Sequence, residues 1–336
     1  MKTLYVFHHT DLDGMGVKFL GMQLAKNFKC KVKTFACNYS EIDDAILNNL
    51  QKANLDNTRG ILIGDISVNA KTAEFLDNLY NEGMDVVLRD HHASAEWLNK
   101  YDWVIVSELD DDGVPRCGTK LVYETYTSYL QCLDKNLQVL VETINDWDCW
   151  LWKEHKKDYA KFLNMLHRLW GDNKFIKYLE GLDMNNVKAP EDLFTTEAKV
   201  SVDVFNSIVE RTASKCEKSL IVTNMKFPRR HGRGHSVTLK CGVIFANDNI
   251  SFIADEILNK HPEIDYIMCF GLPKYVSFRT QKDLAIPLPK IAKMTTGNGG
   301  GHPHSAGAVI SEHQAYRLIK GIMWAVKVKG EFNMHR

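Results

Sequence analysis

An alternation of apolar, strand-like runs with helical stretches dominates the N-terminal third of the chain and constrains its fold most. Runs typical of strands cover residues 2–9, 31–37, 60–67, 85–92 and 102–109. Between the first four runs, residues 16–28, 41–53 and 70–83 have the apolar spacing of amphipathic helices. A chain that alternates strand and helix in this way predicts an α/β fold, with a parallel sheet covered by helices on both faces.

The length of the chain indicates more than one domain. A chain of 336 residues exceeds what a single hydrophobic core usually organises, and 45% hydrophobic with 25% charged residues is ordinary for a globular protein. We expect a catalytic α/β domain over residues 1–155, a helical linker over 156–218 and a smaller C-terminal α/β domain over 219–336. Strand-like runs at 236–246 and 265–280 support the last of these.

Charge and cysteine content exclude several classes of function. The 42 basic and 42 acidic residues cancel, which argues against a protein that coats long nucleic acid, although a short anionic substrate needs only a local basic pocket. The eight cysteines show no CxxC spacing, so neither a thiolate zinc site nor a disulfide framework is indicated. The apolar run at the N-terminus is too short for a signal peptide or a membrane span, so we expect a cytoplasmic protein without a membrane partner.

Acids and imidazoles close three of the predicted parallel strands. The residues at these strand ends are His8 and His9, then Asp65, then Asp90, His91 and His92. Ligands of open α/β sheets bind at the carboxyl ends of the strands, which share one edge. We therefore expect these side chains to converge in space.

The segment HHTDLDG lies where the first strand ends and a helix begins. It carries Asp11 and Asp13 next to His9, and Gly14 permits a tight backbone at this point. Carboxylate oxygens beside an imidazole suit Mn²⁺, Mg²⁺ or Fe²⁺ better than a thiolate-preferring ion. A capped helix N-terminus is the competing interpretation for these aspartates and for Asp65.

Two further segments carry clustered ligand-type side chains. In Asp90-His91-His92 successive side chains point to different faces, so that one imidazole can bind a metal while the next addresses substrate. NDWDCW places Asp146 and Asp148 among aromatic residues. An acidic helix end packed by tryptophans would explain the second segment equally, and chemistry alone does not choose between its two aspartates.

The C-terminal domain offers a candidate anion site. Gly299, Gly300 and Gly301 let backbone N–H groups approach an anion closely, and His302 adds a donor. A flexible turn is the alternative for a glycine-rich stretch alone. The basic cluster at 229–235 is either a solvated turn or a hairpin tip that reaches nucleic acid.

Taken in order, these segments resemble the motifs of the DHH phosphoesterase superfamily: HTDLDG, the aspartate of IGD, RDHH and NDWDCW. GNGGGHPHSAG resembles the GGGHxxAAG signature of the DHH-associated substrate-binding domain, and Arg279 in VSFRT stands where that domain often has its arginine. HHTDLDG, GDISVN, DHHASAEWLN, DDGVPRCGTKLVY and DWDCWLW are most similar to the B-type nano-RNases, which are oligoribonucleases. The resemblance covers most of the chain and is weakest in the helical linker.

The resemblance implies two divalent cations, with Mn²⁺ expected and Mg²⁺ or Fe²⁺ as alternatives. One cation is held by His9, Asp11 and Asp65, and the other by Asp13, Asp65, His91 and Asp148, so that Asp65 bridges them. Asp148 is preferred to Asp146 because DWDCW aligns with the DTW-type motif of the B-type enzymes, and His8 is an extra imidazole beside His9. Asp90 is expected to orient His91, and His92 to contact the scissile phosphate.

The leading hypothesis is an enzyme that hydrolyses short oligoribonucleotides to mononucleotides by two-metal activation of water. Substrate would be gripped in the second domain by Arg279, Gly299, Gly300, Gly301 and His302. An alternative keeps the mechanism and changes the substrate to a cyclic or linear dinucleotide or to 3'-phosphoadenosine 5'-phosphate. Another is a catalytically silent nucleotide-binding protein. The sequence leaves the oligomeric state open, and a homodimer is one option.

Overall fold

The chain divides into two compact units, Met1–Val202 and Asp203–Arg336. The computed structural model describes residues 1–51, 53, 55–130, 136–154, 158–228, 236–271, 275–328 and 331–333. The basic cluster at 229–235 lies outside these residues. The expected domain limits at 155 and 218 stay a prediction.

A parallel five-stranded sheet forms the centre of the first unit, in the order β2-β1-β3-β4-β5. Its strands are β1 Thr3–His8, β2 Lys31–Ala36, β3 Thr58–Gly64, β4 Val86–Asp90 and β5 Val104–Val106. The three central strands are almost continuously buried, as expected for strands covered on both faces. The predicted α/β fold class is confirmed.

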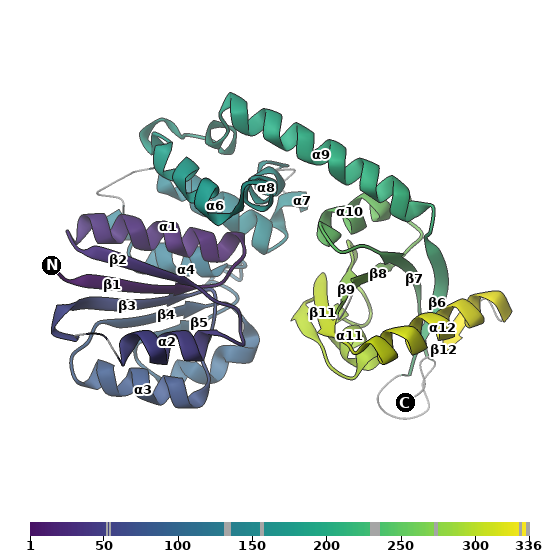
Figure 1. Cartoon of the computed structure of the whole chain (residues 1–336), viewed down its shortest axis with the longest axis horizontal. Coiled ribbons are helices and arrows are strands. Elements are labelled where there is room, and N and C mark those ends of the chain that lie inside the picture. The colour runs from purple at the N-terminus through teal and green to yellow at the C-terminus, as the bar shows by residue number, and fades with distance from the viewer. Residues whose placement is uncertain are drawn as a thin grey trace. The chain divides into compact units, whose positions relative to one another are not determined.

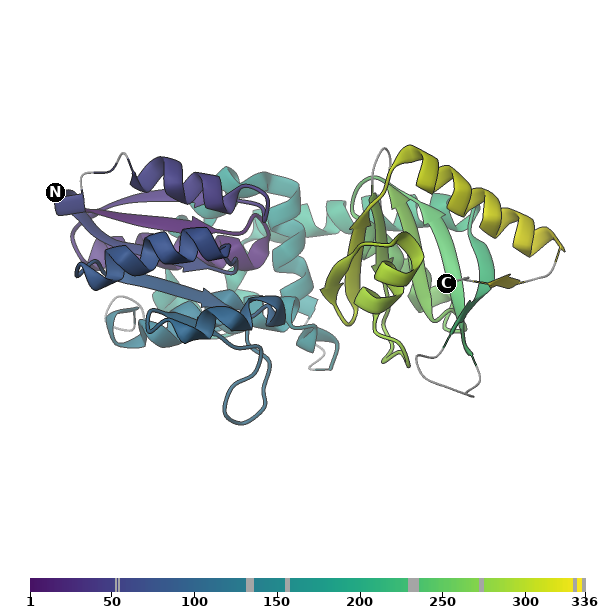
Figure 2. The same cartoon turned by 90° about the horizontal axis from the view of Figure 1, so that it is seen from below.

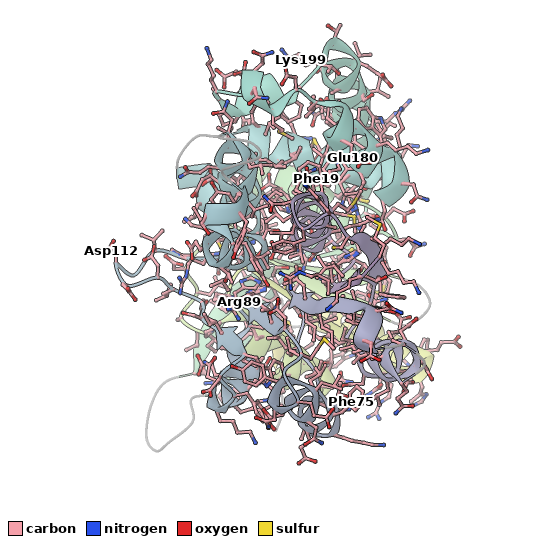
Figure 3. The ribbon with its side chains drawn as sticks, turned by 90° about the vertical axis from the view of Figure 1, so that its left-hand side faces the viewer. Phe19, Phe75, Arg89, Asp112, Glu180 and Lys199 are labelled. Atoms are coloured by element: carbon pink, nitrogen blue, oxygen red, sulfur yellow. The ribbon has the colours of Figure 1, made fainter. Side chains whose placement is uncertain are left out.

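Helices cover both faces of this sheet (Figure 1). Helices α1 (Leu12–Asn27) and α4 (Gly118–Thr125) lie on one face, and α2 (Ile42–Leu50) and α3 (Ala70–Asn81) lie on the other. Figure 3 shows the same layering, with Arg89 of β4 between Phe19 of α1 and Phe75 of α3. Apolar side chains of α2 and α3 pack on Phe7, Ile63 and Leu88 to form one core of this unit.

Further helices extend the first unit beyond the sheet. They are α5 Thr127–Leu130, α6 Leu137–Asp148, α7 Leu151–Glu154 and α8 Asp158–Gly181, with short 3₁₀ segments at Leu55–Asn57, Ala93–Lys100, Met184–Asn186 and Pro190–Leu193. Helix α9, Thr196–Glu217, begins in the first unit and ends in the second. Helix α8 is interrupted at Gly171, whose φ is +70°. Helix α6 packs against α1, α4 and α8, which brings its C-terminal end to the sheet.

The second unit is built on a mixed sheet in the order β10-β11-β9-β8-β7-β6-β12. Its strands are β6 Ile221–Phe227, β7 Val237–Phe245, β8 Tyr266–Gly271, β9 Tyr275–Arg279, β10 Gly300–His302, β11 Ser305–Val309 and β12 Glu331–Asn333. Helices α11 (Leu288–Thr296) and α12 (Glu312–Val328) pack on one face, and α10 (Ile250–Lys260) on the other. Figure 2 shows α12, in yellow, lying across this sheet. Within the described part of the chain, every helix is too short or too polar to cross a bilayer.

Candidate metal centre

The carboxyl ends of β1, β3 and β4 share one edge of the parallel sheet, and each carries a polar side chain. His9 follows β1, Asp65 follows β3 and Asp90 ends β4. The backbone N–H of Asp65 donates to the carbonyl of Arg89 at 2.9 Å. The β3–β4 pairing thus extends to Asp65, which is itself one of the site residues. The sheet topology therefore brings together residues that are more than 50 positions apart in the sequence.

His9, Asp11 and Asp65 form a first cluster. Nδ1 of His9 lies 2.9 Å from Oδ2 of Asp11 and 3.7 Å from Oδ2 of Asp65. One ligand-type atom from each residue lies within 4.8 Å of the others. Asp11 also caps α1, because its Oδ1 accepts the N–H of Gly14 at 3.0 Å. The metal-binding and capping interpretations of this aspartate are thus compatible.

His8 has a different environment from His9. Its side chain is buried, and its Nδ1 lies 2.7 Å from the backbone oxygen of His9. Burial lowers the pKa of His8 to about 4, so that its ring is neutral at physiological pH. Of the two imidazoles, His9 is the one that faces the carboxylates.

A second cluster surrounds His91. Its Nε2 lies 3.4 Å from Oδ2 of Asp148, 3.5 Å from Oδ1 of Asp65 and 3.9 Å from Oδ2 of Asp13. Asp148 reaches this point because it is the last residue of α6, whereas Asp146 is buried within the same helix. Asp65 contributes one oxygen to each cluster and therefore lies between them.

The N-terminus of α4 holds Asp13 in place. The backbone N–H groups of Gly118 and Thr119 donate to its two carboxylate oxygens, both at 2.7 Å. The hydroxyl of Thr119 donates to the backbone carbonyl of Asp13 at 2.6 Å. A side chain on Gly118 would meet the Cα of Asp65 at 2.7 Å, so only glycine allows α4 to approach this closely. Backbone N–H groups at a helix N-terminus commonly bind an anionic oxygen, and Asp13 supplies two such oxygens here.

Asp65 is strained and electrostatically crowded. Its φ of +58° lies in the left-handed region, which costs a non-glycine residue about 1 kcal/mol. Burial, reinforced by the charges of Asp11, Asp13 and Asp148, raises the pKa of its carboxyl well above the usual value. Burial likewise raises the pKa of Asp148 to about 7, with the nearby acids adding to the effect and His91 opposing it. Carboxylates are gathered here at an electrostatic cost that a cation would remove.

The donor set fits divalent cations that prefer oxygen and nitrogen. Oδ2 of Asp65 and Oδ2 of Asp148 are buried and accept no hydrogen bond from the described residues. Octahedral ions of this class separate neighbouring ligands by about 3 Å, close to the spacings around His91. Cys149 also lies near His91 and Asp148, but burial raises the pKa of its thiol, which therefore keeps its proton and is a poor ligand.

Asp90 and His92 form a linked pair beside the second cluster. Oδ1 of Asp90 accepts from the backbone N–H of His91 at 2.8 Å and from Nδ1 of His92 at 2.7 Å. Burial opposes protonation of His92, but the hydrogen bond and the charge of Asp90, together with the charges of Asp148 and Asp11, outweigh it and raise the pKa of His92 to about 9. Oδ1 of Asp90 thus holds both the backbone of His91 and the ring of His92. The expected role of Asp90 in orienting the ring of His91 stays a prediction.

Known proteins resemble this chain in sequence or in fold. It is 26% identical over 324 residues to oligoribonuclease NrnB of Bacillus subtilis, an alignment that covers 94% of this chain and 74% of NrnB. It superposes on RecJ of Thermus thermophilus solved with Mn²⁺ and with Mg²⁺, at TM-scores of 0.52 and 0.53 and 13% identity in each case. The resemblance to the DHH superfamily is confirmed.

The match to RecJ supports a conclusion about fold alone. The match to RecJ covers 99% of this chain but only 53% and 51% of the two RecJ chains, so the chain spans about half of RecJ. At this identity the RecJ structures show a shared fold. No protein-family model matches the sequence.

The expected substrate-binding residues lie in the second unit. Gly300 to His302 form the edge strand β10, which pairs with β11, where we expected a loop. Gly301, with φ of +131°, is required by this hairpin because a side chain would meet the carbonyl oxygen of Ser305 at 2.4 Å. Gly299 precedes the strand with φ of +137°. The phosphate-gripping role of these residues stays a prediction.

Arg279 is firmly anchored at the end of β9. Its Nε donates to the hydroxyl of Ser251 at 3.0 Å, and its Nη1 donates to the carbonyls of Phe278 and Ala306 at 2.8 and 3.1 Å. Burial lowers the pKa of its guanidinium to about 10, which leaves the group charged at neutral pH. Strand β11 lies between β9 and β10, and its Ser305 pairs with Arg279 on one side and with His302 on the other.

Two segments outside the expected site residues also contribute to the centre. Tyr39 follows β2, and its hydroxyl lies 3.0 Å from Nε2 of His92. The rule that ligands gather at the carboxyl ends of parallel strands applies to this strand too and would have found it. Gly118 and Thr119 precede a helix in the segment CGTKL, where backbone donors rather than side chains do the binding.

Proposed function

We propose that the chain is a metal-dependent phosphodiesterase that hydrolyses short oligoribonucleotides to mononucleotides. One observation carries the proposal, namely that Nε2 of His91 lies within 3.9 Å of carboxylates from three separate segments, Asp13, Asp65 and Asp148. The alignment with an oligoribonuclease over 94% of the chain supports hydrolysis of nucleic acid and favours a short substrate. The absence of net charge agrees with a substrate that is held locally.

The first cluster, His9, Asp11 and Asp65, would hold one cation, and Asp13, Asp65, His91 and Asp148 would hold the second. Mn²⁺ is the expected ion, since a RecJ of the same fold was solved with it, and Mg²⁺ and Fe²⁺ are alternatives. When bound, such a pair supplies a water of lowered pKa and neutralises charge on the phosphoryl oxygens.

The protein's own side chains perform the remaining tasks. The N-terminus of α4 fixes both oxygens of Asp13, so that this carboxylate cannot turn away from the centre. Asp90 accepts a hydrogen bond from Nδ1 of His92 and so fixes the ring, which would direct Nε2 toward the side where a phosphate approaches. In the second unit the anchored charge of Arg279, with Gly299, Gly300, Gly301 and His302, would bind a substrate phosphate. No covalent nucleophile is needed.

The test is an assay of the full chain with added Mn²⁺ on RNA of two to five nucleotides. We expect mononucleotide release that a chelator abolishes and that Asp65→Asn reduces by at least about 100-fold. The absence of any chelator-sensitive release would contradict the proposal. If Asp65→Asn and His91→Ala left metal content and activity unchanged, a silent nucleotide-binding protein would explain the chain better.

The same assay separates the alternative substrates. Cyclic and linear dinucleotides and 3'-phosphoadenosine 5'-phosphate share the phosphoester that the centre would attack. A strong preference for one of these over short RNA would keep the mechanism and replace the substrate. A cytoplasmic location and a homodimer also stay predictions, and sedimentation of the purified chain would test the second.

A further inference from the structure

Tyr39 places a hydroxyl group against the histidine that we assign to the scissile phosphate. From this arrangement, and resting on the proposed function, we infer that Tyr39 is a substrate-contacting residue whose hydroxyl donates to a non-bridging oxygen of the scissile phosphodiester. Its Oη lies 3.0 Å from Nε2 of His92, and its ring centroid lies 5.3 Å from that of His9. The side chain thus touches residues from both halves of the candidate centre.

The segment that carries Tyr39 is tied to the turn that carries His9 and Asp11. The backbone N–H of Cys37 donates to the carbonyl of His8 at 2.9 Å, and the hydroxyl of Thr10 donates to Oδ1 of Asn38 at 3.2 Å. Glu41 closes the turn, since its Oε2 accepts from the backbone and the side-chain N–H groups of Asn38 at 3.0 and 3.1 Å. Tyr39 is therefore held in a fixed position although it stands in a loop.

Hydrogen-bond directions around His92 explain why a phosphate must meet Tyr39. Nδ1 of His92 lies 2.7 Å from a carboxylate oxygen of Asp90, which can only accept, so Nδ1 carries the proton of this hydrogen bond. Each imidazole nitrogen has one hydrogen-bonding direction in the ring plane, and the Tyr39 hydroxyl occupies that of Nε2. A phosphate oxygen that approaches Nε2 therefore arrives at the hydroxyl.

The chemistry of the hydroxyl favours contact over exclusion. A phenol is protonated at neutral pH and donates, and hydrogen bonds to an oxyanion are about twice as strong as neutral ones. The hydroxyl has one proton and two lone pairs, so it can accept from an Nε2–H of His92 and at the same time donate to a phosphate oxygen. Tyr39 is 51% exposed, so a substrate can reach it without rearrangement of the core.

The first test is Tyr39→Phe in the full chain with Mn²⁺, which removes one oxygen and keeps the ring. We expect turnover of short RNA, as kcat/KM, to fall about 10- to 100-fold, with metal content and melting temperature unchanged. Tyr129→Phe is the matched control, because Tyr129 is 49% exposed and its ring packs on Phe28, away from the centre. This control variant should keep wild-type turnover.

A sulfur substitution in the substrate distinguishes a hydrogen bond to phosphate from a role in packing. RNA dinucleotides that carry sulfur at either non-bridging position should be cleaved more slowly, because sulfur accepts hydrogen bonds poorly. For one of the two diastereomers, the fold reduction in cleavage rate caused by sulfur should be smaller in Tyr39→Phe than in the wild type. A reduction caused by weaker binding of sulfur to Mn²⁺ would be the same in both proteins.

The outcomes separate this inference from the function on which it rests. An active wild-type chain whose Tyr39→Phe variant retains full turnover, or retains the full sulfur penalty at both positions, would overturn the role of Tyr39 alone. A wild-type chain that cleaves none of the substrates would refute the proposed function and this inference with it.

Discussion

Asp65 combines burial, a left-handed backbone and carboxylate neighbours, which a residue of purely structural role would avoid. Asp65→Asn should separate its contributions, because asparagine tolerates the left-handed region and carries no charge. We expect activity to fall at least about 100-fold while the metal-free protein becomes more stable, by on the order of 1 kcal/mol. Chemical denaturation in chelator, beside an activity assay, measures both effects. A variant that is less stable than the wild type without metal would contradict the claim that the carboxylate of Asp65 destabilises the metal-free protein.

Asp148 predicts how the stability of the metal-free protein depends on pH. Its pKa of about 7 in the folded chain exceeds the unfolded value of about 4, so the folded state binds the proton more tightly. The stability that this proton provides is complete below pH about 4 and is lost as the pH rises through about 7. Denaturation in chelator at several pH values should show this decline, and Asp148→Asn should reduce its slope. A slope that the variant leaves unchanged would assign the decline to other groups.

The hydrogen bond from His92 to Asp90 predicts that Asp90 positions the ring of His92. Asp90→Asn keeps one acceptor oxygen but removes the negative charge, so the hydrogen bond that fixes the ring of His92 weakens. We expect kcat to fall about 10- to 100-fold with metal content retained. Steady-state kinetics and metal analysis of the same preparation provide the measurement. Loss of bound metal would show instead that Asp90 acts through His91.

The sequence predicts which residues meet at the site when each of them stands at the end of a strand. It does not predict a contact that depends on the direction in which a side chain points. His9, Asp65 and His91 come together because parallel strands share an edge, and this required no knowledge of rotamers. The partner of Asp90 depends on how the His92 ring turns, which sequence spacing does not specify. Asp148 is the last residue of α6 and Asp146 lies two residues earlier, and the sequence alone does not show where the helix ends.

At the scale of elements, α4 supplies two backbone donors to the centre and depends on a glycine to do so. In Gly118→Ala the new methyl group would lie 2.7 Å from atoms of Asp65, so α4 must move and the bonds to Asp13 must lengthen. We expect a loss of about 1–3 kcal/mol in stability together with reduced activity. Gly181→Ala is the matched control, because no atom lies within 4 Å of its new methyl group. Denaturation curves of the two variants compare them, and equal stability would contradict the close packing.

Apolar periodicity predicted the parallel sheet well and the glycine segment poorly. Residues 2–9, 60–67 and 85–92 have a strong apolar pattern, and β1, β3 and β4 form at these positions. The three glycines from Gly299 to Gly301 have no side chains and hence no pattern, so their pairing in β10 depends on β11 beside them. Pairing with a neighbouring strand decides the secondary structure of such a segment, and the sequence alone does not predict a strand there.

At the scale of the molecule, the candidate metal ligands all lie in the first unit, while the second unit has a hydrophobic core of its own. A ligand that binds only the folded state stabilises it by about 2.7 kcal/mol at a concentration 100 times its Kd. For a unit of this size that corresponds to a rise of about 5 to 10 °C in melting temperature. Calorimetry with Mn²⁺ and with chelator should therefore show one transition that moves and one that does not. Asp65→Asn should abolish the movement, whereas transitions that shift together would mean that the two units unfold as one.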